Sequence, residues 1–137
     1  AKKNRKSMSR QWPEDTTILL VEDNLPTLQL VRARLQLEGI LVLEAQNGLE
    51  ALDHLRQATV HGVVTDLMMP AMDGFRLIQE IRELPGEQAH VPILVISANQ
   101  NEADMVRCLA SGADDFMAKP LSLPVLIERL WRLVRRR

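Results

Sequence analysis

The sequence predicts an α/β domain built around a parallel β-sheet. Five short apolar runs alternate along the chain with five amphipathic, helix-like stretches, an alternation that is typical of βαβ units. The first, third and fourth runs are continuously apolar, as expected for parallel strands that helices cover on both faces. The expected strands are residues 17–21, 40–44, 62–65, 92–96 and 115–118.

The stretches between these runs carry signals for the start and end of helices. Asn24 precedes a stretch with Pro26 near its first turn, and Asn47 and Ser122 can cap two others. Right-handed crossovers should join the successive units. Leu49, Leu52 and Leu55 share one face of the second helix, and Met105, Val106 and Leu109 form the apolar face of the fourth. Pro85-Gly86 ends the third helix and Gly112 ends the fourth. The expected helices are residues 26–37, 49–57, 74–84, 102–110 and 124–134.

Composition limits the chain to one domain of ordinary globular type. It has 137 residues, of which 46% are hydrophobic and 26% charged, and domains average roughly 150 residues. Aromatic residues make up only 3%, so the core should be aliphatic. The sequence contains no apolar stretch of the ~18 residues needed to span a membrane, and no secretory signal.

The charge and the cysteine content of the chain indicate which kinds of partner and which cellular compartment to expect. The single cysteine, Cys108, cannot form an internal disulfide, which favours a reducing, cytoplasmic location. A net charge of −1 argues against direct nucleic-acid binding through a global field. Neither a nucleic acid nor a membrane is therefore expected as a partner of this domain.

Basic residues gather at the two ends of the chain. Residues 1–14 are expected to form a flexible leader or linker, and residues 15–137 the domain itself. A basic arm that grips nucleic acid or a membrane is the alternative for the leader. The absence of an initiator Met suggests that the chain was excised from a longer one. The basic residues concerned are Lys2, Lys3, Arg5, Lys6 and Arg10 in the leader, and Arg135-Arg136-Arg137 at the end.

Acidic side chains follow two expected strands at the point where each strand ends. Glu22 and Asp23 close the first apolar run, and Asp66 closes the third. The carboxyl ends of parallel strands meet at one crevice, where such folds bind ligands. Three carboxylates held there are costly without a cation, and Mg²⁺ prefers oxygen ligands of this kind. The alternative is that the acids are solvated loop charges or helix caps.

A hydroxyl and an amine follow the fourth and fifth expected strands. Ser97 follows the fourth run, and Lys119 follows the fifth and precedes Pro120. A cis Lys119-Pro120 peptide, which X–Pro bonds permit, would aim the amine at the crevice. Phosphoryl transfer needs an aligned nucleophile and positive charge on the phosphoryl oxygens. The pattern thus predicts aspartyl-phosphate chemistry with Asp66 as the nucleophile, whereas either residue alone would more often be a helix cap or a solvated charge.

Together these motifs resemble the receiver (CheY-like) domain of two-component response regulators, over about residues 15–137. The resemblance implies a flavodoxin-like, doubly wound sheet of five parallel strands, in the order 2-1-3-4-5, flanked by five helices. The motifs are Glu22-Asp23, Asp66 with Met68-Met69-Pro70 and Asp73-Gly74, Ser97-Ala98, Gly112-Ala113-Asp114-Asp115 and Lys119-Pro120.

The resemblance also implies a role for each site residue. Asp66 would accept a phosphoryl group from a histidine kinase or a histidine phosphotransfer protein. Mg²⁺ would be bound by Asp23, Asp66 and the Met68 carbonyl, with Glu22 acting through a water. Lys119 and Ser97 would contact the phosphoryl group. The domain would catalyse only its own phosphorylation and dephosphorylation.

The expected output surface comprises residues 102–110, the last strand and residues 124–134. Ser97 and Phe116 would form the switch pair that changes it, although Phe116 lacks the hydroxyl of a tyrosine. Receivers that dimerise through this face commonly pair a basic and an acidic residue, where this chain has Met105 and Val125. The expected partner is therefore an output domain, another hetero-partner or a weak homodimer.

Two other classes remain open from the residues. An aspartyl-nucleophile phosphohydrolase would carry a second acid two residues after Asp66, where this chain has Met68. A receiver-like binding scaffold would have lost acids or the lysine, and this chain keeps them all.

Overall fold

Five parallel strands form one sheet in the order β2-β1-β3-β4-β5, which confirms the predicted topology. The computed structural model describes residues 11–99 and 101–136; most of the predicted leader and Arg137 lie outside the described residues. The strands are β1 (Thr17–Val21), β2 (Leu41–Ala45), β3 (Gly62–Asp66), β4 (Ile93–Ser97) and β5 (Asp115–Ala118).

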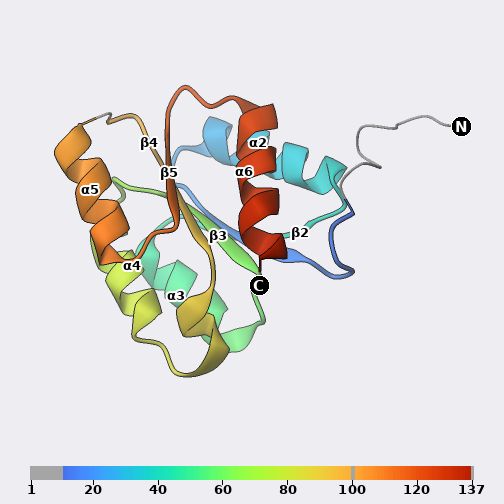
Figure 1. Cartoon of the computed structure of the whole chain (residues 1–137), viewed down its shortest axis with the longest axis horizontal. Coiled ribbons are helices and arrows are strands. Elements are labelled where there is room, and N and C mark those ends of the chain that lie inside the picture. The colour runs from blue at the N-terminus through green and yellow to red at the C-terminus, as the bar shows by residue number, and fades with distance from the viewer. Residues whose placement is uncertain (1–10, 100, 137) are drawn as a thin grey trace, which may run out of the picture.

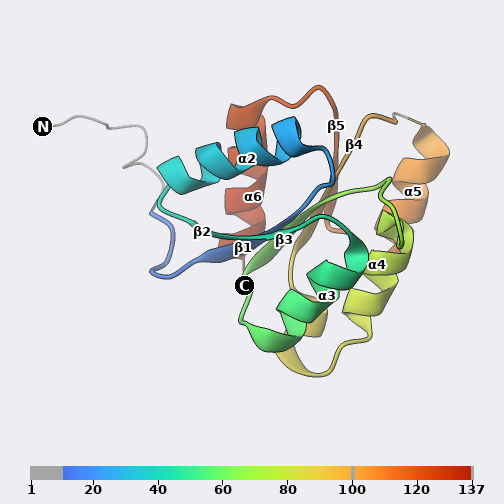
Figure 2. The same cartoon turned by 180° about the vertical axis from the view of Figure 1, so that it is seen from behind.

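Helices cover both faces of the sheet. In Figures 1 and 2, α2 and α6 lie on one face, and α3, α4 and α5 lie on the other. The helices are α2 (Leu25–Leu37), α3 (Gly48–Gln57), α4 (Gly74–Arg82), α5 (Glu102–Ser111) and α6 (Leu123–Arg135), with a short 3₁₀ helix η1 (Gly86–His90). The alternation of strand and helix therefore gives the doubly wound arrangement that the sequence predicted.

The bounds of β1 and β5 match the prediction, and the ends of the other predicted elements differ from it by at most two residues; η1 was not predicted. Ile40 lies between α2 and β2 rather than in β2, because its N–H donates to the Leu35 carbonyl at 3.2 Å. The helix α4 ends at Arg82 because Glu83 and Leu84 donate to carbonyls only three residues back. Such tightened last turns are common at helix ends.

The core consists of two aliphatic layers, one on each face of the sheet. Leu19, Val63 and Val95 face α3, α4 and α5, whereas Ile18, Leu20 and Val64 face α2 and α6. The period-two alternation of strand side chains divides each strand between the two layers. Both layers are built mainly from Leu, Ile and Val, as the low aromatic content predicted.

The apolar face predicted on α5 is largely exposed rather than buried. Met105, Val106 and Leu109 are 36%, 58% and 45% exposed, while Cys108 is buried. Leu49 of α3 likewise points outward, with 55% exposed, although Leu52 and Leu55 are buried. Periodicity indicates which residues share a helix face, but the neighbours of the helix decide how much of that face they cover.

Side-chain caps begin all five α-helices that the structure describes. The predicted caps Asn24, Asn47 and Ser122 each accept from a backbone N–H in the first turn, and Asp73 and Asn101 do the same for α4 and α5. These caps start each helix directly after a strand or its loop, so the strand ends stay clear for polar side chains. None of the helices described here is long and apolar enough to cross a membrane.

Candidate functional site

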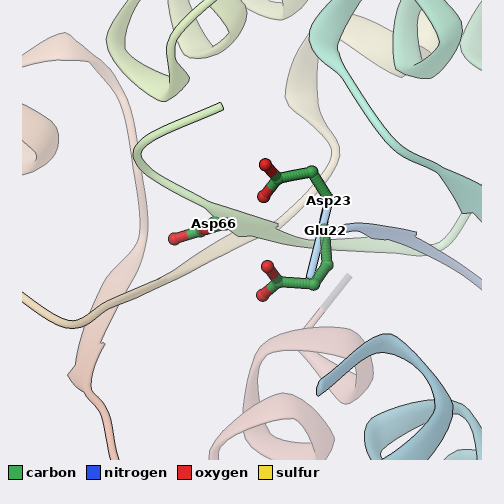
Figure 3. A group of neighbouring side chains, drawn as sticks. All are labelled: Glu22, Asp23 and Asp66. Carbon is green, nitrogen blue, oxygen red and sulfur yellow. The ribbon is translucent and has the colours of Figure 1, made fainter. Parts of the chain in front are cut away.

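Glu22, Asp23 and Asp66 converge at the carboxyl edge of the sheet. Each places a carboxylate oxygen within 4.8 Å of the others. Figure 3 shows Glu22 and Asp23 projecting from the chain just after β1, with Asp66 at the end of β3, all toward one shared space. Strand pairing explains the convergence, because Val21 is in register with Thr65. The structure thus brings together the three acids that the sequence singled out.

Glu22 is fully buried, and three partners hold it. Its own N–H donates to the Ala45 carbonyl at 2.9 Å, which extends the β1–β2 ladder by one residue. The Asn24 N–H donates to its Oε2 at 3.1 Å, and Lys119 Nζ lies 3.1 Å from its Oε1. Burial raises the pKa of Glu22, the Asn24 N–H lowers it, the nearby Asp66 charge raises it, and Lys119 lowers it. The net effect is a raised pKa.

Asp66 is the last residue of β3 and is 7% exposed. The Leu67 N–H donates to its Oδ1 at 2.8 Å, which fixes the side-chain rotamer, while its Oδ2 lies 3.7 Å from Lys119 Nζ. Gly74 allows the following loop to return tightly: its N–H donates to the Leu67 carbonyl at 2.7 Å, and a Cβ there would lie 3.0 Å from the Asp66 carbonyl oxygen. The Asp73-Gly74 motif therefore shapes the loop that carries Met68.

Lys119 reaches the acids from the end of β5. Its peptide bond to Pro120 is cis, as the sequence predicted, and its N–H donates to the Ser97 carbonyl at 2.8 Å. Its ammonium lies closer to Glu22 than to Asp66. One amine thus faces the buried oxygens of two carboxylates.

Ser97 ends β4 and is fully buried. Its Oγ accepts the Asn99 N–H at 3.0 Å, a local turn that leaves the hydroxyl hydrogen available for another acceptor. Phe116, the other member of the predicted switch pair, is only 8% exposed. An inward movement of this ring would therefore start from a position that is already buried.

Two backbone donors in the site were not predicted from the sequence. The Asn24 and Leu67 N–H groups hold Glu22 and Asp66 in place, and every residue except proline carries such a group. No residue type could have identified them. Met68 is 63% exposed, so most of its side chain faces solvent.

A parallel five-stranded sheet that gathers three acids and a lysine at its carboxyl edge defines the receiver class of signalling domains. The family model described as the response regulator receiver domain matches residues 18–131. The chain therefore belongs to the response regulator receiver family, and it is a receiver domain of two-component signalling rather than a conventional enzyme.

Relatives and solved structures agree with this assignment. Response regulator MprA of Mycobacterium sp. (strain KMS) is 36% identical over 119 residues, which are 87% of this chain and 50% of the relative. The CpxR homolog of Haemophilus influenzae, named as a transcriptional regulatory protein, is 37% identical over 87% of this chain and 50% of its own length. The chain spans about half the length of the curated relatives that it matches.

Among solved structures, the receiver domain of a sensor histidine kinase from Pseudomonas aeruginosa PAO1 superimposes with a TM-score of 0.81 at 30% identity. The match covers 88% of this chain and 98% of that one, and that structure holds a magnesium ion coordinated in its active-site cleft. A putative response regulator from Chloroflexus aurantiacus gives a TM-score of 0.85 at 26% identity, over 90% of this chain and all of that chain.

Proposed function

We propose that Asp66 accepts a phosphoryl group from a phosphohistidine, in a reaction that depends on Mg²⁺. The donor would be a histidine kinase or a histidine phosphotransfer protein. The observation that carries the proposal is the placement of Asp66, whose carboxylate lies beside two further carboxylates and the Lys119 amine. A cytoplasmic location is part of the same proposal.

The donor set fits a magnesium ion. Three carboxylates within 4.8 Å of one another are all-oxygen ligands with excess negative charge, which a hard divalent cation favours. Exposed Asp23 and buried Asp66 would contact the ion directly, together with the Met68 carbonyl. Glu22 is held by Asn24 and Lys119, so it suits a role through a bound water. The ion would supply positive charge to the phosphoryl oxygens during transfer.

The transfer step needs few residues. A carboxylate oxygen of Asp66 forms the new O–P bond as the P–N bond to the donor imidazole breaks, and the imidazole nitrogen keeps the electron pair. The Leu67 N–H, 2.8 Å from Oδ1, holds the carboxylate in one orientation and thereby aligns the attack. Hydrolysis of the acyl phosphate by water would return Asp66 to its starting state, which is the only other reaction that we assign to the domain.

Lys119 and Ser97 would stabilise the phosphorylated state. The ammonium rests 3.1 Å from Glu22 and needs only a rotation of its flexible side chain to contact a phosphoryl oxygen on Asp66. The Ser97 hydroxyl could donate to another phosphoryl oxygen, because its oxygen accepts the Asn99 N–H and its hydrogen is not needed for that bond. A phosphoryl group adds about −2 charge at neutral pH, which would draw both groups toward Asp66.

Mass spectrometry of the whole chain tests the phosphoacceptor. After treatment with acetyl phosphate and Mg²⁺, the unaltered chain should gain the mass of one phosphoryl group, and Asp66→Asn should gain none. Asp53→Asn is a matched control, because Asp53 is an exposed residue of α3 that pairs with Arg56. A gain in Asp66→Asn equal to that of the unaltered chain would refute the assignment, and a gain without Mg²⁺ would refute the metal dependence.

The surface of α5, β5 and α6 would transmit the state of Asp66. A shallow hollow of about 400 Å³ lies there, lined by Met105, Phe116, Val125 and Arg129 among others. The exposed apolar face of α5 adjoins this hollow. Phe116 of β5, which lines the hollow, pairs in the sheet with β4, the strand that ends at Ser97. The chain spans half of relatives that are named as regulators, so an output domain or another hetero-partner is the favoured occupant, and a weak homodimer is the alternative.

A further inference from the structure

Both tryptophans of the chain lie together at the end of the sheet opposite the acids. Trp12 precedes β1, and Trp131 lies near the end of α6. Their ring centroids are 5.2 Å apart with an interplanar angle of 71°, an edge-to-face geometry that stabilises aromatic pairs beyond the area they bury. Aromatic residues are only 3% of this chain, so the pair is a specific feature of this surface.

A short segment before β1, residues 11–16, carries Trp12 and is called the strap below. The Trp12 Nε1 donates to Glu38 Oε1 at 2.9 Å, and the Glu38 side chain, at the end of α2, is only 4% exposed. The Trp12 ring also packs against the apolar layer of α2 and α6. The strap therefore contacts the far ends of both helices at once.

Apart from Trp12, the strap is tied to the domain at its last residue, where the Thr16 carbonyl accepts the Leu41 N–H at 2.9 Å. Trp12 is half-buried and Thr16 is buried, but the other four residues of the strap are exposed. Asp15 has φ +65°, a left-handed conformation that non-glycine residues seldom adopt, so the docked backbone carries some strain. Segments with little burial and exposed backbone open at lower free energy than the core.

The two helices that the strap joins begin at the candidate site. The helix α2 starts at Leu25, two residues after Asp23, and α6 starts at Leu123, four residues after Lys119. Figures 1 and 2 show α2 and α6 side by side on one face of the sheet. The near ends of these helices thus adjoin the acidic and the basic segments of the site, and their far ends meet at the strap.

We propose that the strap is a releasable clamp on α2 and α6. When it is docked, Trp12 holds the far ends of the two helices together; when it is released, the first turns of both helices loosen beside Asp23 and Lys119. The docked and released forms make a two-state element, which is what coupling between distant sites requires. Through it, chain that precedes the strap can act on the site. The proposal needs neither bound metal nor phosphorylation.

The first experiment tests release. Trp131→Phe leaves Trp12 as the sole tryptophan and keeps an aromatic ring against it. A denaturant titration is followed by Trp12 emission and by far-ultraviolet circular dichroism on the same samples. The Trp12 transition should have its midpoint at a lower denaturant concentration than the dichroism transition. Coincident transitions would overturn the proposal, because the strap would then open only with the whole domain.

The second experiment tests coupling by amide hydrogen exchange in the metal-free protein. The probes are the first-turn bonds Leu28 N–H to Asn24 O in α2 and Leu126 N–H to Ser122 O in α6, both 2.9 Å. The internal control is the matching bond of α4, Leu77 N–H to Asp73 O at 3.0 Å. In Trp12→Ala, exchange at Leu28 and Leu126 should quicken about threefold or more, with no change at Leu77.

Two further variants make this result decisive. Trp12→Phe keeps a ring but removes the N–H that Glu38 accepts, so amide exchange at Leu28 and Leu126 should quicken less than in Trp12→Ala. This variant also allows the test to be made if Trp12→Ala does not fold. Gln11→Ala alters an exposed neighbour and should change nothing. Unchanged exchange at Leu28 and Leu126, or an equal rise at Leu77, would overturn the coupling.

Discussion

Two charged clusters lie at opposite ends of the same sheet, and they are balanced differently. At the carboxyl end, three carboxylates gather beside one amine, that of Lys119, which pairs with Glu22 and Asp66. At the other end, the guanidinium of Arg82 in α4 has several hydrogen-bond acceptors around it. It donates to the carbonyls of Gly112, Ala89 and Val91 and to Asp114 Oδ2, over distances of 2.7–3.0 Å.

The Arg82 cluster is suited to stability and the acid cluster to binding. Asp114 Oδ2 also accepts the Ile93 N–H at 2.8 Å, so this carboxylate beside Arg82 holds the starts of β4 and β5 together. In the acid cluster, negative charge exceeds positive charge, and like charges in close contact oppose folding. An excess of one charge where strands converge indicates a ligand-binding site, whereas a matched pair of charges indicates a structural role.

The largest expected effect is a loss of domain stability when the Arg82 cluster is disrupted. Arg82→Ala should lower the free energy of unfolding by about 2–4 kcal/mol, because several acceptors and the Asp114 carboxylate lose a charged donor together. Arg76→Ala is the control: Arg76 forms an exposed pair with Glu80, and its loss should cost about 0.5 kcal/mol or less. Urea titrations measure both, and equal small losses would break the contrast between the clusters.

The next effect is on metal affinity. Asp23→Asn should weaken Mg²⁺ binding about tenfold or more, because it removes charge from an expected direct ligand. Glu22→Gln should weaken it less, since Glu22 is expected to act through a water. Titration calorimetry of the two variants and the unaltered chain checks the order. A larger loss in Glu22→Gln would reverse the assignment of the direct ligand.

A smaller effect concerns pH in the absence of metal. The pKa of Glu22 is raised above its ordinary value of 4.5, first by burial and also by the Asp66 charge. The folded state therefore holds this proton more tightly than the unfolded state, so the contribution of Glu22 to stability should fall as pH rises from about 4.5 through the raised pKa. With a chelator present, the unaltered chain should lose stability relative to Glu22→Gln over that window. A difference that is constant with pH would contradict this account.

The smallest effect is expected at a third, exposed charge pair. Arg129 lies 3.6 Å from Asp115 within the same chain and also donates to the Phe116 carbonyl, so it is already engaged inside the monomer. Sedimentation of the beryllofluoride-treated domain should show monomer or a weak dimer, with little change in Arg129→Glu. A tight dimer that Arg129→Glu dissociates would show that charge pairing between copies governs this face.

Sequence patterns predicted features that depend on neighbours along the chain. Continuous apolar runs identified buried strands, and Asn24, Asn47 and Ser122 identified helix starts, because hydrophobic periodicity and capping are local. The convergence of Glu22, Asp23 and Asp66 also followed, since parallel strands connected by helices must place all their carboxyl ends at one edge. Periodicity identified the apolar face of α5 but not its exposure, because the exposure of Met105, Val106 and Leu109 depends on which helices lie beside them.

By itself, the sequence determined the α/β class, the edge at which the polar residues gather and the identity of those residues. Only the tertiary structure decided that Lys119 rests on Glu22, 97 positions away, that the Asn24 and Leu67 N–H groups hold the carboxylates, and that Trp12 meets Trp131. The physical reason is the same in each case. These contacts join groups that are remote in sequence or common to every residue, so their geometry is set by how the packed layers come together rather than by any local pattern.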